Sequence, residues 1–292
     1  MPQPTAPEDV IRLWPEGPPT TIEGVGPEIQ FSGPVGVAGG AVMLRNTLDP
    51  TLSVFKPAKP NGVGIIVVPG GGWSLLAWEH EGTDVVKWLT GLGYTAFLLK
   101  YRVRATPPRQ EGYDAEMMEI YSKIDLTRTA KTAYRAMRDI IDTPQIRAAR
   151  DAAADDGRRA IAIVRERAAE WGLDPAKLGM LGFSAGAFLT ADVAMDPRAE
   201  QLAFIAPIYG GETLGRPVPA DAPPMFTALA QNDALLYRVV EGLYSDWTDA
   251  GRSAEMHIYR RGEHGFGMVK QGLPSDGWTK LFEDWLTDLG FA

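Results

Sequence analysis

The chain has 292 residues, a length that fits one large α/β domain or two smaller ones. Hydrophobic residues make up 45% of it and charged residues 23%, so it can bury a substantial core. The formal net charge of -8 argues against a nucleic-acid-binding protein, which normally presents a basic face. The absence of cysteine excludes disulfides, thiolate nucleophiles and cysteine-ligated zinc.

The N-terminal stretch "MPQPTAPEDV" has neither the basic nor the apolar region of a signal peptide. As the sequence stands we therefore expect a cytoplasmic protein, and a periplasmic or secreted one if a signal peptide has been removed. No apolar run approaches the roughly 18–20 residues of a membrane span, so we expect a soluble protein that does not insert into membranes.

Residues 1–40 are rich in proline and glycine and show no clear periodicity, which predicts an extended arm lying on the domain. The remainder, 41–292, is the predicted α/β domain. Its first two runs, 41–47 and 51–58, alternate in part and flank a turn at Asp49-Pro50. That pattern predicts an antiparallel hairpin.

The chain then alternates between strand and helix patterns. The continuous β-branched run 62–68 is typical of a buried central strand. A helix is expected over 81–93 and a strand over 94–102. This order predicts a mostly parallel sheet flanked by crossover helices. The second half continues it, with strands over 177–183, 202–209, 224–231 and 253–260 and helices over 185–195, 234–250 and 276–289.

The stretch 103–156 interrupts this alternation. It is charged, rich in alanine and helical in character, and it stands where a short loop would suffice. One interpretation is a solvated helical excursion. The other, which we favour, is a helical cap over a site at the carboxyl ends of the strands, where insertions are tolerated.

The pentapeptide "GFSAG", Gly182–Gly186, matches G-x-S-x-G and lies between a predicted strand and a predicted helix. That context is the one required of a nucleophile elbow, in which small flanking residues permit a very tight turn. The turn lifts the Ser184 hydroxyl away from the backbone and points the N–H of Ala185 into the same space. We predict Ser184 as a nucleophile; the alternative is an ordinary glycine-rich turn.

A serine nucleophile needs a base that works near neutral pH, and histidine is the usual one. The chain has three histidines. His257 lies inside a predicted strand, where we expect it to be packed. His264 lies in the loop "RRGEHGFG" after that strand, at the edge where Ser184 is expected, and it is the predicted base. His80 either lines the pocket or is a surface residue at a helix start.

The imidazole in turn needs a carboxylate to fix its tautomer. Asp233 follows a predicted strand and lies between Ser184 and His264 in the chain. We predict Asp233 in this role. Other aspartates are weaker candidates because they lie on predicted helices or in a proline-rich loop: Asp192, Asp196, Asp221 and Asp246.

The stretch "VVPGGGWS", 67–74, places three glycines directly after the predicted central strand. It does not fit a phosphate-binding loop, because leucine replaces the third glycine of G-x-G-x-x-G and no G-x-x-x-x-G-K-[ST] occurs. Backbone N–H groups aimed at a developing oxyanion fit better, since glycine allows close approach. The predicted donors are Ala185 and either Gly71 or Gly72; a hinge is the alternative.

Together, the stretch 67–102, the hexapeptide "LGFSAG" and the spaced Asp233 and His264 resemble the α/β-hydrolase esterases. The resemblance is strongest to bacterial carbohydrate esterases of the acetylxylan-esterase and feruloyl-esterase type. It covers roughly residues 40–104 and 155–290 and implies an α/β-hydrolase fold with no metal or cofactor, to which the insertion adds the expected helical cap.

The chain departs from these relatives at Pro69, where HGGG-type lipases carry histidine, and at Ala187, where glycine is frequent. The insertion is also longer than is usual among them.

The resemblance implies a serine carboxylesterase that hydrolyses short-acyl, acetyl-type esters through an acyl-enzyme. Its expected partner is a small-molecule or carbohydrate ester. Trp73 either stacks against a sugar or packs in the core. Alternatives are a serine peptidase or dienelactone-type hydrolase of the same fold and, more remotely, a non-catalytic binding protein. The oligomeric state is left open.

Overall fold

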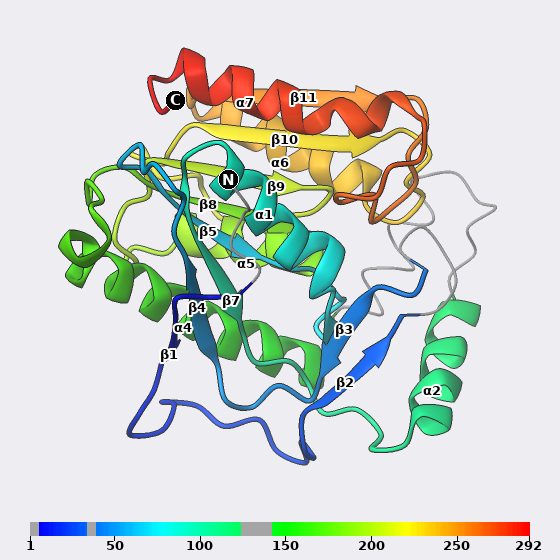
Figure 1. The fold of residues 1–292 in the computed structure, drawn as a ribbon. Helices are drawn as coiled ribbons and strands as arrows, with labels where there is room; N and C mark the ends of the chain where they lie inside the picture. The colour runs from blue at the N-terminus through cyan, green and yellow to red at the C-terminus, as the bar shows by residue number, and fades with distance from the viewer. Residues whose placement is uncertain (1–5, 34–38, 124–141) are drawn as a thin grey trace.

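The computed structural model describes residues 6–33, 39–123 and 142–292. A large sheet of eight strands dominates it (Figure 1). In spatial order its strands are β1 (Asp9–Arg12), β4 (Thr51–Phe55), β7 (Thr95–Lys100), β5 (Gly64–Val68), β8 (Leu178–Phe183), β9 (Phe204–Ile208), β10 (Met225–Ala230) and β11 (Ala254–Tyr259). From β7 to β11 all neighbours are parallel, whereas β4 is antiparallel to both β1 and β7. The predicted mostly parallel sheet is therefore confirmed.

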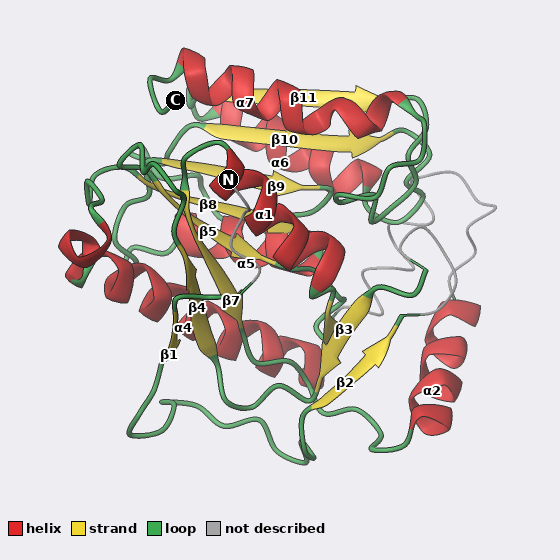
Figure 2. Cartoon of the chain, in the orientation of Figure 1, coloured by secondary structure: helices red, strands yellow, loops and turns green. Residues whose placement is uncertain are grey.

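Helices cover both faces of this sheet (Figure 2). They comprise the α-helices α1 (Asp84–Gly91), α2 (Gln110–Ser122), α4 (Pro144–Glu166), α5 (Ala185–Ala194), α6 (Tyr237–Asp249) and α7 (Trp278–Asp288), the π-helix η1 (Glu79–Thr83), and the 3-10 helices η2 (Ala168–Trp171) and η3 (Pro274–Gly277). Every strand and helix predicted from residue 62 onward, the insertion aside, coincides with one of these elements within three residues at each end.

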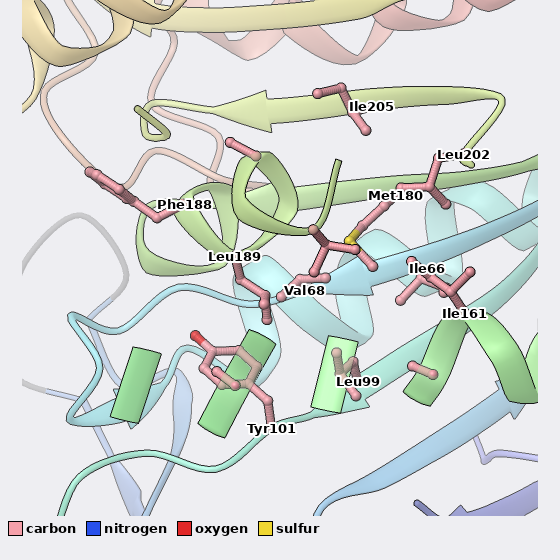
Figure 3. Packing of buried hydrophobic residues seen from close by; sticks show 14 of the residues in the cluster. Ile66, Val68, Leu99, Tyr101, Ile161, Met180, Phe188, Leu189, Leu202 and Ile205 are labelled. Carbon is pink, nitrogen blue, oxygen red and sulfur yellow. The ribbon is translucent and has the colours of Figure 1, made fainter. Parts of the chain in front are cut away.

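Strand periodicity divides the apolar residues between two cores. In β5, Ile66 and Val68 face a core shared with α4, α5 and α6, whereas Ile65 and Val67 face a core shared with α1 and α7. Successive strand side chains point to opposite faces, so a continuous apolar run is what a strand covered on both faces requires. Figure 3 shows the first core, where strand residues pack toward Leu189 of α5.

The predicted hairpin over 41–47 and 51–58 is wrong. Its first strand, β3 (Val42–Arg45), pairs with β2 (Ile29–Ser32) and β6 (Leu75–Leu76) in a separate three-stranded sheet, and only β4 joins the large sheet. Between them Asn46 adopts a positive φ of 57°, and its buried amide oxygen accepts from the backbone N–H of Thr106 at 2.9 Å. This long-range hydrogen bond holds the chain after β3 away from a hairpin with β4, and no local pattern in the sequence predicts it.

The predicted arm over 1–40 contributes strands to both sheets. β1 pairs with β4 as the first strand of the large sheet, and β2 pairs with β3. Consequently β5, which precedes the triple glycine, is the third strand of the large sheet in chain order, after β1 and β4. A division of the chain at residue 40 stays a prediction.

The predicted cap over 103–156 contains two different structures. α2 lies beside the small sheet, whereas α4 runs on to Glu166 and packs against α5. Ala149, Ala153 and Ala160 are fully buried there, because small side chains let the helix approach its neighbours closely. Residues 144–156 therefore belong to the crossover helix between β7 and β8 and not to an inserted cap. Residues 124–141 lie outside the described chain.

A buried ion pair joins the end of β7 to α4. The guanidinium of Arg102 donates to Asp156 at 2.8 and 2.9 Å, and these residues are 1% and 0% exposed. Trp14 of the N-terminal stretch donates to the same carboxylate at 2.8 Å. Burial raises the pKa of Asp156 even though Arg102 and Trp14 lower it, so desolvation outweighs the attraction.

In the described parts of the chain, no helix combines the length and the apolar character that crossing a membrane requires.

Breaking the Arg102–Asp156 pair should be far more harmful than breaking an exposed one. Asp156→Ala leaves Arg102 buried without its counter-ion, so we expect a loss of about 3–5 kcal/mol in the free energy of unfolding, measured with urea. Asp49→Ala removes the partner of Arg12 in a pair more than half exposed, and should change stability by less than about 1 kcal/mol. Equal losses of stability in the two variants would contradict the conclusion that burial makes the Arg102–Asp156 pair the more important one.

Candidate functional site

Ser184 occupies the tight turn between β8 and α5. Its backbone has φ 48° and ψ -114°, a conformation that residues other than glycine rarely adopt. The flanking glycines are sterically required: a Cβ on Gly182 would lie 2.2 Å from the carbonyl oxygen of Gly186, and one on Gly186 would lie 2.1 Å from that of Val68. The turn predicted from "GFSAG" is therefore present, with a strained serine at its apex.

The structure brings the three predicted residues of the triad together. The Oγ of Ser184 lies 2.8 Å from Nε2 of His264, and Nδ1 of His264 lies 2.7 Å from Oδ2 of Asp233. With Nδ1 protonated and donating to Asp233, Nε2 is free to accept from the serine hydroxyl. By contrast, Asp192 is bound to Arg150 at 2.5 Å, and His257 lies 2.6 Å from Glu255 on β11.

Asp233 is held rigidly behind His264. It is 1% exposed, and its Oδ1 accepts from the backbone N–H groups of Leu235 and Leu236 at 2.9 and 3.0 Å. Burial raises the pKa of this carboxyl group, but His264 and the two backbone donors outweigh burial and hold it below its ordinary value. Asp233 therefore stays ionised opposite the imidazole.

The loop that carries His264 is fixed to the loop that carries Asp233. The side-chain oxygen of Asn232 accepts from the backbone N–H groups of Gly262 and Glu263 at 3.1 and 3.0 Å.

Burial lowers the pKa of His264, but the carboxylates of Asp233 and Glu81 outweigh burial and raise the pKa above the ordinary value of a histidine. The site thus favours the imidazolium that forms when a serine proton is accepted.

The triple glycine lies directly against the elbow. A Cβ on Gly70 would lie 2.8 Å from Cβ of Ser184, and the N–H of Gly70 donates to Glu81 at 2.8 Å. Gly71 and Gly72 have positive φ values of 136° and 59°. Within the described chain, no hydrogen bond engages the N–H of Gly71, Gly72 or Ala185. Three N–H groups thus remain available where oxyanion donors were predicted.

A second set of hydrogen bonds connects the triple-glycine loop to α2. The hydroxyl of Ser74 donates to the carbonyl of Gly72 at 3.3 Å and accepts from Nε of Arg104 at 2.9 Å. Arg104 in turn donates to Glu116 of α2 at 2.9 Å. The peptide that follows Gly72 is thereby tied to α2.

Ser184 and His264 open into a cavity of about 1380 Å³. Much of its wall is apolar and comes from β2, β3, α2 and α5, including Phe31, Met43, Met117 and Phe188. Such a cavity exceeds what a small ligand requires, so it has room for a bulky one. Within the described residues, no group of three or more histidine, aspartate or glutamate side chains is arranged to hold a metal ion.

Two predicted binding residues, Trp73 and His80, are less accessible than expected. Trp73 is 3% exposed and packs edge-on against Tyr101, with ring centroids 6.2 Å apart, which favours the core-packing alternative over sugar stacking. His80 lines the cavity but is only 6% exposed, so the alternative of a surface histidine is wrong. A binding role for either residue stays a prediction.

Sequence reasoning overlooked three residues that organise this site: Glu81, Tyr209 and Asn232. Glu81 stands within a run of charges, "WEHEGTD", that also fits an exposed helix start, and Tyr209 ends an ordinary apolar strand. Their side chains become informative only when three loops distant in sequence meet.

Comparisons with known proteins agree with this architecture. A family model described as alpha/beta hydrolase fold matches residues 147–222. A curated acetylxylan esterase of Xylanibacter ruminicola is 26% identical over 270 residues, which are 81% of this chain and 46% of that protein. The chain thus spans about half the length of this relative.

Solved structures resemble most of the chain. An acetyl ester-xyloside bifunctional hydrolase from Caldicellulosiruptor lactoaceticus covers 98% of both chains with a TM-score of 0.65 and 22% identity. A thermophilic esterase from Thermogutta terrifontis covers 84% of this chain and 89% of its own, with a TM-score of 0.58 and 20% identity. The chain has the α/β-hydrolase fold, and the predicted resemblance to carbohydrate esterases is confirmed.

Two adjacent glycines should respond differently to a methyl group. In Gly71→Ala the new Cβ would lie 2.1 Å from the carbonyl oxygen of Leu75, so we expect a loss beyond about 4 kcal/mol in the free energy of unfolding. In Gly72→Ala no atom lies within 4 Å, leaving only the strain of a positive φ, about 1–2 kcal/mol. Urea titration of both variants measures this, and a reversed order would refute the packing described.

Proposed function

We propose that this chain is a serine carboxylesterase that hydrolyses acetyl-type esters of carbohydrates. The observation that carries the proposal is the chain of contacts from Ser184 to His264 at 2.8 Å and from His264 to the buried Asp233 at 2.7 Å, with Ser184 and His264 lining a large cavity. Nucleophile, base and orienting carboxylate stand in the geometry that acyl transfer requires.

Acylation begins when Oγ of Ser184 attacks the ester carbonyl carbon. The hydroxyl proton passes to Nε2 of His264, and the electron pair of the carbonyl double bond moves to its oxygen. Asp233 stabilises the resulting imidazolium without taking the proton itself. The strained backbone of Ser184 presents Oγ to the cavity with little rearrangement.

The tetrahedral oxyanion is stabilised by the N–H of Ala185 and by one from Gly71 or Gly72. Such preorganised donors contribute on the order of 3 kcal/mol each, because they need no reorientation as charge develops. When the intermediate collapses, the bond to the alcohol oxygen breaks, and the alcohol leaves with the proton from His264. Water then attacks the acyl-enzyme with His264 again as base, and this step releases the carboxylic acid and free Ser184.

The size and lining of the cavity support a bulky, uncharged alcohol group. Its volume of about 1380 Å³ is far larger than the space that an acetyl group occupies. Arg104 and Arg45 both line it: Arg104 is paired with Glu116 at 2.9 Å, and Arg45 is only 1% exposed, with its guanidinium carbon 5.0 Å from the ring centroid of Tyr113. The acetylxylan esterase with which the chain shares 26% identity supports acetylated carbohydrate as the substrate class.

A panel of p-nitrophenyl esters together with acetylated xylan tests this function. We expect acetate to be hydrolysed faster than octanoate, and acetate to be released from the polysaccharide. Ser184→Ala should lower kcat by a factor on the order of 10⁶, because no nucleophile remains to form the acyl-enzyme.

Labelling with a fluorophosphonate probe provides the control, since it requires only an activated serine. An unlabelled wild type, or equal labelling of Ser184→Ala, would rule out the mechanism. Preference for octanoate would overturn the short-acyl assignment, and cleavage of peptides without ester hydrolysis would favour a peptidase.

The pH dependence of kcat/KM should report His264, which accepts a proton only when neutral. Because the pKa of His264 is raised, activity should climb with pH through a limb that lies at higher pH than an unperturbed histidine would give. Asp233→Asn removes the neighbouring carboxylate, so the pKa of His264 falls and the limb moves to lower pH, while kcat drops on the order of 10⁴-fold. A limb that stays in place in this variant would contradict the assignment of Asp233.

A further inference from the structure

We propose that Glu81 is a positioning residue whose buried carboxylate ties the glycine loop to the histidine loop through Tyr209. This inference rests on the proposed function, since it assigns a task within the same site. Glu81 lies in η1 and lines the cavity, yet it is only 3% exposed. No step of acyl transfer requires it to contact the substrate.

Each carboxylate oxygen of Glu81 accepts a hydrogen bond from a different loop. Oε2 accepts from the N–H of Gly70 at 2.8 Å, in the loop after β5. Oε1 accepts from the hydroxyl of Tyr209 at 2.7 Å, at the end of β9. The same hydroxyl accepts from the N–H of Gly267 at 3.1 Å, in the loop that carries His264. One side chain therefore connects three segments far apart in the sequence.

On the side of the nucleophile this contact leaves almost no free space. A Cβ on Gly70 would lie 2.6 Å from Oε2 of Glu81 and 2.8 Å from Cβ of Ser184. Gly70 is thus clamped between the carboxylate and the elbow. The position of Gly70 fixes where the peptides of Gly71 and Gly72 begin. Glu81 thereby sets how far the predicted oxyanion donors lie from Ser184.

On the side of the base, the helix η1 docks against the histidine loop. The carbonyl of His80 accepts from the N–H of Met268 at 3.0 Å, and a Cβ on Gly267 would lie 2.8 Å from the same oxygen. The Tyr209 ring stands edge-on to the imidazole of His264, with centroids 5.2 Å apart. A shift of Glu81 would therefore move both the donors and the base.

The charge of Glu81 acts on the site as well. The groups that face it are His80, with Nε2 3.7 Å from Oε1, the hydroxyls of Tyr209 and Tyr101, and His264 beyond Tyr209. Within the described chain, neither a lysine nor an arginine forms an ion pair with Glu81. Its negative charge consequently reaches His264, where it adds to that of Asp233 and helps to raise the pKa of the imidazole.

Replacing Glu81 by glutamine distinguishes the effects of its charge and its hydrogen bonds from the effect of side-chain packing. Glutamine has nearly the same shape, but it carries no charge, and its amide offers only one acceptor oxygen for two donors. In Glu81→Gln we expect the imidazole of His264 to titrate at lower pH, and kcat/KM on p-nitrophenyl acetate to fall about 100-fold as the loops lose register.

The titration is followed by NMR of the intact protein with labelled histidine, which is practical because the chain has only three histidines. This readout needs no turnover. A wild type that hydrolyses no ester would therefore refute the proposed function, while the titration would still decide the influence of Glu81 on His264.

Two further variants complete the test. Tyr209→Phe removes the bridge to Gly267 and keeps the charge, so kcat/KM should fall about 10-fold or more while His264 titrates near its wild-type pH. Asp84→Asn neutralises a carboxylate on the adjacent helix α1, bound to Lys87 at 2.8 Å, and should leave both measurements unchanged.

The inference is overturned if Glu81→Gln leaves the titration of His264 in place, or if Asp84→Asn moves it equally. It is also overturned if Tyr209→Phe retains full activity. Should Glu81→Gln fail to fold, Tyr209→Phe alone still decides whether the bridge to the histidine loop matters.

Discussion

The close packing of β8, the elbow and the end of β5 is the constraint on which the site depends. Ser184 can hold its positive φ only because two glycines let the turn pass within contact distance of neighbouring backbone. The carbonyl of Val68 lies where any side chain at Gly186 would stand. Two central strands, each buried on both faces, hold this arrangement, so the strain at one residue is supported by the sheet as a whole.

Around this fixed point the structure arranges loops that are individually irregular. Asn232 ties the loop of Asp233 to that of His264, and Glu81 ties the glycine loop to Tyr209. Each tie uses side-chain oxygens that accept from backbone N–H groups or a hydroxyl, and Glu81 is buried whereas Asn232 is exposed. A buried polar group such as the Glu81 carboxylate is stabilising only when it is satisfied, so the loops that it joins are specified together.

The two carboxylates near His264, those of Asp233 and Glu81, act on the imidazole in different ways. Asp233 touches the imidazole directly, whereas Glu81 acts through Tyr209 and through space. Both favour the charged imidazole, which suits the proposed role of His264 as a base. The result is a site whose basicity and geometry are set by the same buried groups.

The sequence by itself determined the parallel core and predicted that Ser184, Asp233 and His264 meet at one edge of the sheet, because both depend on local patterns. Apolar runs of strand length mark β5 and β8, and the glycines around Ser184 are demanded by a turn that only small residues can form. His264 and Asp233 followed because parallel strands bring their carboxyl ends to one edge.

Only the tertiary structure decided the rest. The separation of β3 from β4 depends on Asn46 meeting Thr106, and the continuation of α4 past residue 156 depends on its packing against α5. The role of Glu81 depends on loops that follow three different strands. Such contacts join residues far apart in the chain, and no local periodicity encodes which distant partner a buried polar side chain will find.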